Sequence, residues 1–98
     1  MEIRFHLEAL VEYTAAADHY AAIDSTLALR FADAVEHAVA RISDAPAAWP
    51  TIDQDVRRCL TRVFPFALLF TVEPTYVLIV SVMHCSREPG YWTIRRDR

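Results

Sequence analysis

The second half of the chain carries side chains that together could cleave RNA. Internal attack by a 2′-hydroxyl needs a base, cationic donors around the phosphate and an acid for the leaving oxygen. Histidine changes its protonation near neutral pH, so His84 could serve as the base or as the acid. Three arginines could hold the phosphate and two aromatic residues could stack on a base, namely Arg58, Arg62, Arg87, Tyr91 and Trp92.

Each of these residues also has a structural interpretation. His84 ends a strongly apolar run, where it could be a hydrogen-bonded structural histidine. Tyr91 and Trp92 could close the edge of a hydrophobic core, and Arg58 could pair with acidic residues of the preceding loop. The residue types alone leave both interpretations open.

The charges are unevenly distributed along the chain. Residues 1–55 hold three Arg and ten Asp or Glu (3 − 10 = −7), whereas residues 56–98 hold seven Arg and three Asp or Glu (7 − 3 = +4). The basic residues are all arginine, which favours planar, forked contacts with phosphate or carboxylate. Because the net charge is −3, long-range attraction of the whole protein to nucleic acid would be weak or repulsive.

The residues that commonly bind metals are not arranged as a metal site. Cys59 and Cys85 are far apart and lack the close spacing of paired zinc ligands, so we expect both to be buried packing residues. Glu8, Glu12 and His19 share one helical face, which we interpret as a solvated polar stripe. We expect no metal and no cofactor.

Nothing in the sequence predicts a membrane association. The longest apolar runs, Phe66 to Val72 and Tyr76 to Met83, are far shorter than the roughly 20 residues that span a bilayer. The N-terminus enters a patterned segment at once and leaves no room for a signal peptide. We therefore expect a cytoplasmic protein.

The first half of the chain predicts a strand followed by two helices. Ile3 and Phe5 alternate within an extended segment at residues 2–6. Helical spacing then begins and predicts helices at residues 7–23 and 26–44, with a short connection that makes them an antiparallel hairpin. The inward face expected for the first helix consists of Leu7, Leu10, Val11, Thr14, Ala17 and Ala21.

The second half predicts a sheet. Pro46 and Pro50 end the helical region, and a loop runs to Asp55. Three β-rich runs follow, at Val56–Phe64, Phe66–Glu73 and Tyr76–Cys85, and they predict an antiparallel meander. Glu88-Pro89-Gly90-Tyr91 fits a type II turn.

These elements predict an α+β fold in a single domain, residues 1–98. The N-terminal strand and the meander form a twisted antiparallel β-sheet, and the antiparallel two-helix hairpin packs on one face of that sheet. The other face is expected to be exposed.

The order of these motifs resembles the RelE/ParE superfamily of toxins from bacterial type II toxin–antitoxin systems. The resemblance rests on the acidic hairpin, the Pro46–Pro50 loop, Val56-Arg57-Arg58, Phe64-Pro65-Phe66, Val82-Met83-His84 and the segment from Arg87 to Trp92. It implies a growth inhibitor that a cognate antitoxin neutralises, a role in plasmid stabilization, and a toxin–antitoxin hetero-oligomer.

The superfamily contains two mechanisms on one fold, so the fold alone does not decide the target. ParE-like members poison DNA gyrase, and RelE-like members cleave mRNA on the ribosome. The absence of lysine and a pI near 5.7 favour the ParE-like function here. The alternatives are a ribosome-dependent mRNA endonuclease that uses His84, Arg87 and Tyr91, and a non-toxic remnant that only binds the antitoxin.

For a gyrase poison, the residues expected to contact the target follow from the basic second half of the chain. They are Arg58, Arg62, Arg87, Tyr91 and Trp92.

Overall fold

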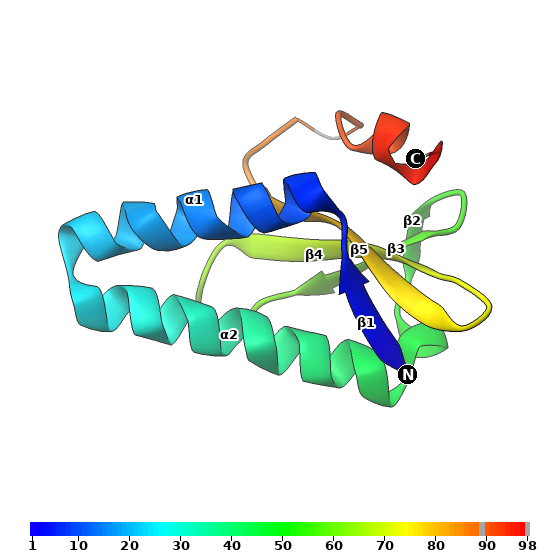
Figure 1. Ribbon diagram of the computed structural model, residues 1–98, viewed down its shortest axis with the longest axis horizontal. Helices are drawn as coiled ribbons and strands as arrows, with labels where there is room; N and C mark the ends of the chain where they lie inside the picture. Colours follow the sequence, from blue (N-terminus) through cyan, green and yellow to red (C-terminus); the bar gives the residue numbers. More distant parts are fainter. Residues whose placement is uncertain (89, 98) are drawn as a thin grey trace.

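The computed structural model describes residues 1–88 and 90–97 and contains two long helices and five strands. Figure 1 shows the two long helices running antiparallel to each other, with β1 at their right-hand end. The elements in chain order are β1 (Glu2–Phe5), α1 (Leu7–Ile23), α2 (Ser25–Asp44), η1 (Pro46–Ala48), β2 (Thr51–Asp53), β3 (Val56–Leu60), β4 (Phe66–Val72), β5 (Tyr76–His84) and η2 (Thr93–Asp97).

The strands form one mixed sheet in the order β1-β5-β4-β3-β2. β1 pairs in parallel with β5, and the other three pairs are antiparallel. The predicted α+β fold, with a helical hairpin on a sheet that the N-terminal strand joins, is confirmed. The prediction that the whole sheet is antiparallel is wrong, because β1 pairs in parallel with β5. The loop predicted before Asp55 contains the additional strand β2, whose three residues are all exposed.

One residue, Asp24, separates the two helices. Its backbone N–H donates to the carbonyl of Tyr20 and ends α1, while its side chain accepts from the N–H of Thr26 at 2.8 Å and caps α2. α2 then buries a stripe at helical spacing: Phe31, Val35, Ala38 and Ile42. The short connection predicted between the two helices is therefore correct.

The face predicted for the first helix is wrong except at Ala17, which packs against the core. Leu7 and Val11 are 73% and 60% exposed, and the inward face instead carries alanines, Glu12 and two tyrosines. Small side chains at Ala9, Ala16 and Ala17 let α1 lie close to its neighbours. The tyrosine rings then fill the remaining space, so the large aliphatic side chains of α1 face solvent.

An aromatic cluster forms the centre of the core between the hairpin and the sheet. The ring of Phe31 lies 5.0 Å from that of Phe66, 5.1 Å from that of Tyr20 and 5.4 Å from that of Phe64. Tyr13 contacts Phe31 edge-on at 5.9 Å. Edge-to-face packing of this kind contributes beyond the burial of area alone.

The face of the sheet opposite the helices was predicted to be exposed, but it is partly covered. The C-terminal segment folds back over it, and Trp92, 1% exposed, packs with buried residues of three strands. This second cluster consists of Val56, Ala67, Leu69, Val80, Met83 and Trp92. The sheet is therefore covered on both faces, at least in part.

Three smaller expectations have mixed outcomes. Cys59 is buried as predicted, but Cys85 lies in the turn after β5 and is exposed. Gly90 has a φ of +102°, a conformation that favours glycine, whereas Pro89 of the expected type II turn lies outside the described residues. Within the described part of the chain, no helix is long and apolar enough to cross a membrane.

Replacing Phe31 by alanine tests the packing of the hairpin on the sheet. Phe31→Ala should lower the free energy of unfolding by about 3–5 kcal/mol, because the cluster loses its central ring. Leu29→Ala on the exposed side of the same helix should change it by less than about 0.5 kcal/mol. Urea denaturation of both variants measures the difference, and equal losses would contradict this packing.

Candidate functional site

The site lies where β5 extends beyond its parallel neighbour. The pairing of β1 with β5 ends at Phe5 opposite Ile79, and the N–H of His6 donates to the carbonyl of Ile79 at 2.9 Å. The chain then turns into α1, whereas β5 continues to His84. Residues 80–84 therefore have an edge with no strand beside it, and its polar groups need other partners.

Glu12 of α1 takes the place of the missing strand. One carboxylate oxygen, Oε1, accepts from the N–H of Val82 at 3.1 Å and from the hydroxyl of Ser81 at 3.0 Å. The guanidinium of Arg95 donates to both carboxylate oxygens, at 2.8 and 3.2 Å, and to the carbonyl of Val80 at 3.0 Å. Val80 is the extra residue of a β-bulge opposite Leu69 and Phe70, which makes its carbonyl available.

This pair is shielded from solvent. The side chains of Arg95 and Glu12 are 9% and 14% exposed, and Glu8 makes a looser contact with Arg95 at 3.4 Å. Burial tends to lower the pKa of Arg95, but the hydrogen bonds and charge of Glu12 outweigh it, so the pKa is raised. Arg95 therefore stays charged, and the C-terminal segment is attached to α1 and β5 by a forked ion pair.

Arg87 and Tyr91 extend this network towards solvent. The Arg87 guanidinium carbon lies 3.5 Å from the centre of the Tyr91 ring, and Arg87 Nη1 is 3.7 Å from Glu12 Oε2. The Tyr91 hydroxyl hydrogen-bonds with the Ser81 hydroxyl at 2.8 Å. Burial raises the pKa of Tyr91, so its hydroxyl stays protonated at neutral pH and is a poor general base.

His84 belongs to a different environment. Its ring packs edge-on against Phe66 at 5.1 Å, and Phe66 belongs to the core on the hairpin side of the sheet. Its Nδ1 accepts from the N–H of Ser86 at 3.0 Å. The backbone N–H of Arg87 donates to the carbonyl of His84 at 2.9 Å, but the described contacts of the His84 imidazole are with Phe66 and Ser86. Of the three proposed catalytic side chains, those of Arg87 and Tyr91 contact each other.

The remaining predicted residues lie in three separate places. Arg58 is exposed on β3, opposite Leu69 and therefore on the face that Trp92 covers. Arg62 is in the β3–β4 loop and lines a pocket with residues of α2. Trp92 is buried as a packing residue and is not accessible for stacking on a partner. Arg62 therefore lies apart from the face of the sheet that carries Arg58 and Trp92.

Sequence reasoning missed the central pair of this site. Glu12 was assigned to a solvated stripe with Glu8 and His19, but only Glu8 and His19 are exposed. No sequence pattern distinguishes Arg95 from the other C-terminal arginines. The two halves of the chain carry opposite charge, which favours ion pairs between them. This pattern does not identify Glu12 and Arg95, which are 83 positions apart, as a pair. In the described part of the chain, no three His, Cys, Asp or Glu side chains are placed to hold a metal ion.

Comparison with known proteins decides the family. Residues 3–89 match the model of the ParE toxin of the type II toxin–antitoxin system parDE. The chain belongs to the ParE toxin family. It is therefore a toxin of a type II toxin–antitoxin system, whose partner is an antitoxin. No functionally curated protein matches the sequence significantly.

A solved structure supports the fold. The chain is similar to a structure described as the chromosomal ParDE toxin–antitoxin system from P. aeruginosa, with a TM-score of 0.74 and 18% sequence identity. The match covers 86% of this chain and 95% of that one. The match to the family model ends at residue 89, so Tyr91, Trp92 and Arg95 of this ParE-family toxin follow the matched range.

Replacing Glu12 tests whether it anchors the C-terminal segment. Glu12→Ala should lower the free energy of unfolding by about 3–5 kcal/mol, because it leaves the buried Arg95 charge without its partner. Glu8→Ala is the matched control, since Glu8 is half-exposed and should contribute less than about 1 kcal/mol. Equal effects in urea denaturation would show that the forked pair is not the anchor.

Proposed function

We propose that this ParE-family toxin acts in the cytoplasm by binding DNA gyrase and performs no hydrolytic chemistry of its own. The observation that carries the proposal is that the imidazole of His84 contacts Phe66 and Ser86, whereas the side chain of Arg87 stacks on Tyr91. RNA cleavage needs a proton-transferring group within hydrogen-bond reach of the same phosphate that the cations hold. Here the histidine packs on Phe66, and the tyrosine is a protonated hydroxyl bound to Ser81.

The charge of the protein supports binding to a protein target over binding to ribosomal RNA. An RNA-directed enzyme gains affinity from many phosphate contacts, which lysine-rich surfaces supply. This chain has no lysine and a net charge of −3. A few forked arginine contacts suit recognition of a defined protein surface better.

The proposed target-binding residues are Arg87, Tyr91 and Arg58. The side chain of Arg87 is 53% exposed, and its stack on Tyr91 fixes the guanidinium in one orientation. Arg58 projects from β3, which is separated from β5 by one strand, a distance of about 10 Å between strand axes. Arg62 is not proposed to contact the target, because it lines a pocket with residues of α2. Trp92 is not proposed either, because it is buried.

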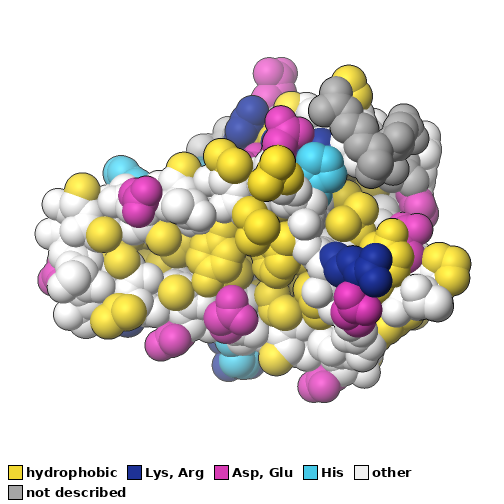
Figure 2. Space-filling model, in the orientation of Figure 1, with side chains coloured by type: hydrophobic (Ala, Val, Ile, Leu, Met, Phe, Trp, Pro, Cys, Tyr) yellow, Lys and Arg dark blue, Asp and Glu magenta, His cyan; other side chains and the backbone are white. Residues whose placement is uncertain are grey.

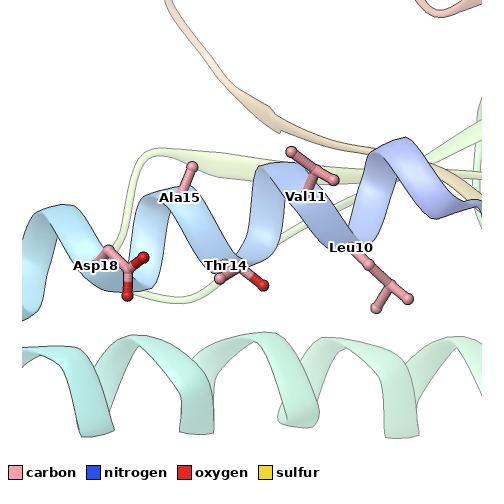
Figure 3. A pocket seen from close by; sticks show the side chains of 5 residues that line it. All are labelled: Leu10, Val11, Thr14, Ala15 and Asp18. Carbon is pink, nitrogen blue, oxygen red and sulfur yellow. The ribbon is translucent and has the colours of Figure 1, made fainter.

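The antitoxin is proposed to cover the outer face of α1. Figure 2 shows hydrophobic side chains gathered along and between the two helices on the side away from the sheet. On α1 a shallow depression of about 360 Å³ is lined by Leu10, Val11, Thr14, Ala15 and Asp18, which Figure 3 shows spaced along the helix. Exposed aliphatic side chains in such a row are typical of a surface that a partner helix covers.

The toxicity of two variants separates gyrase binding from RNA cleavage. Arg87→Ala should abolish growth arrest, because the stacked guanidinium is lost, while its melting temperature stays close to that of the parent. His84→Gln should remain toxic, whereas an endonuclease that used His84 would lose roughly a hundredfold or more in cleavage rate.

Induction of each variant in cells, followed by assays of DNA-damage signalling and mRNA integrity, measures these outcomes. Arg4→Ala serves as a surface-arginine control, since Arg4 forms an ion pair with the neighbouring Glu2 and stacks on Tyr76. Full toxicity of Arg87→Ala, or cleaved mRNA with the parent protein, would contradict the proposal. A parent protein that is harmless at high expression would support the non-toxic remnant instead.

Charge substitution on α1 tests the antitoxin surface. Val11→Glu should weaken antitoxin binding at least tenfold, because a charge would be buried against the partner helix. Leu29→Glu places the same charge on the exposed side of α2 and should leave the affinity unchanged. Calorimetric titration with the cognate antitoxin measures both affinities, and equal affinities for Val11→Glu and the parent would place the antitoxin elsewhere.

A further inference from the structure

The loop between β3 and β4 forms a second pocket together with α2, and none of the proposed target-binding residues lines it. The pocket measures about 320 Å³. Four of its residues come from α2 and three from the loop: Arg30, Asp33, Ala34, His37, Arg62, Val63 and Phe64. It therefore combines two arginines and a histidine with an apolar floor.

Val63 has a strained backbone at the rim of this pocket. Its φ is +72°, and the N–H of Phe64 donates to the carbonyl of Arg62 at 2.8 Å, which closes a tight γ-turn around Val63. A γ-turn with positive φ is rare, and a β-branched residue is among the least suited to it. Glycine would make the same turn without strain, so the turn does not require the valine side chain.

The strained turn is held rigidly. The hydroxyl of Thr61, itself buried, lies 2.8 Å from the carbonyl oxygen of Phe64 and 3.1 Å from that of Phe66. The ring of Phe64 is fixed against Phe31 and Tyr20. Val63 nevertheless points outward and is 86% exposed, so the loop presents an aliphatic side chain to solvent in one fixed position.

The cations around the pocket lack carboxylate partners. Among the described residues, neither Arg30 nor Arg62 is in a salt bridge, although Asp33 also lines the pocket. By contrast, Arg4, Arg87 and Arg95 each have a carboxylate within 4.0 Å. The pocket thus joins Arg30 of the acidic first half and Arg62 of the basic second half, and neither guanidinium is in a salt bridge among the described residues.

We propose that this pocket binds an acidic segment of a partner protein, with a carboxylate between Arg30 and Arg62 and an aliphatic side chain against Val63, Ala34 and Phe64. Forked pairing of arginine with a carboxylate supplies the orientation. A nucleic acid fits less well, because two arginines beside Asp33 on an acidic protein offer few phosphate contacts. The pocket contains neither Arg87 nor Tyr91 and no residue of the outer face of α1. This proposal can therefore be tested independently of the gyrase and antitoxin proposals.

Selection from a random dodecapeptide library tests the proposal. The immobilised full-length chain is the bait, and the double variant Arg30→Ala/Arg62→Ala is used for counterselection. Enriched peptides should carry Asp or Glu within two positions of Leu, Ile or Val. The best peptide should shift the backbone amide signals of Ala34 and Val63 on titration and bind the double variant at least tenfold more weakly.

A single variant tests the aliphatic contact of the pocket separately from the stability of the fold. Val63→Gly should weaken peptide binding several-fold while the melting temperature stays equal or rises, because the backbone strain is relieved. Arg4→Ala and Leu29→Ala, which alter exposed residues outside the pocket, should bind the peptide like the parent.

Several results would overturn the proposal. They are no enrichment over the counterselection, enriched peptides without acidic residues, amide shifts on α1 instead of the pocket, or a marked drop in melting temperature with Val63→Gly. A twelve-nucleotide single-stranded DNA that shifts the same amides more strongly than the peptide would assign the pocket to nucleic acid and also refute it.

Discussion

The carboxylate of Glu12 is the group on which the arrangement of this protein depends. It accepts four hydrogen bonds, from Ser81, from Val82 and two from Arg95, and so joins α1, the bulged edge of β5 and the C-terminal segment. Burying a carboxylate and a guanidinium costs free energy that only such close, saturated pairing offsets. The same contacts satisfy the backbone of β5 at Val80 and Val82, where β1 has already ended.

The second cluster of the core follows from this anchor. Arg95 holds the segment that carries Trp92, and Trp92 fills the far face of the sheet over Leu69 and Val80. A chain of 98 residues buries only a limited fraction of its surface on folding. Covering both faces of one sheet increases the apolar area that is buried. The indole N–H of Trp92 is buried without a hydrogen-bond partner in the described structure, which indicates that the ring contributes through apolar packing alone.

Sequence patterns predicted those parts of the fold that have strong local signals. The stripe from Phe31 to Ile42 and the apolar runs of β4 and β5 gave correct elements, because their buried residues follow helical or strand periods. The pattern failed for α1, where alanines face the core and Leu7 and Val11 face solvent, since close packing and a buried Glu12 override the hydrophobic period. It failed for the site because Glu12 and Arg95 meet only through the tertiary fold.

The same network explains how Arg87, which lies beside the Glu12–Arg95 ion pair, can still bind a partner protein. The lone pairs of Glu12 are used by Ser81, Val82 and Arg95, and Arg87 stands 3.7 Å away, beyond hydrogen-bond distance. Arg87 is therefore attracted to Glu12, but the hydrogen bonds of Glu12 are satisfied without it. The planar face of the Arg87 guanidinium stacks on Tyr91. A partner carboxylate or phosphate could take the free edge of this guanidinium without breaking any contact that fixes the C-terminal segment, so its loss should weaken binding without unfolding the protein.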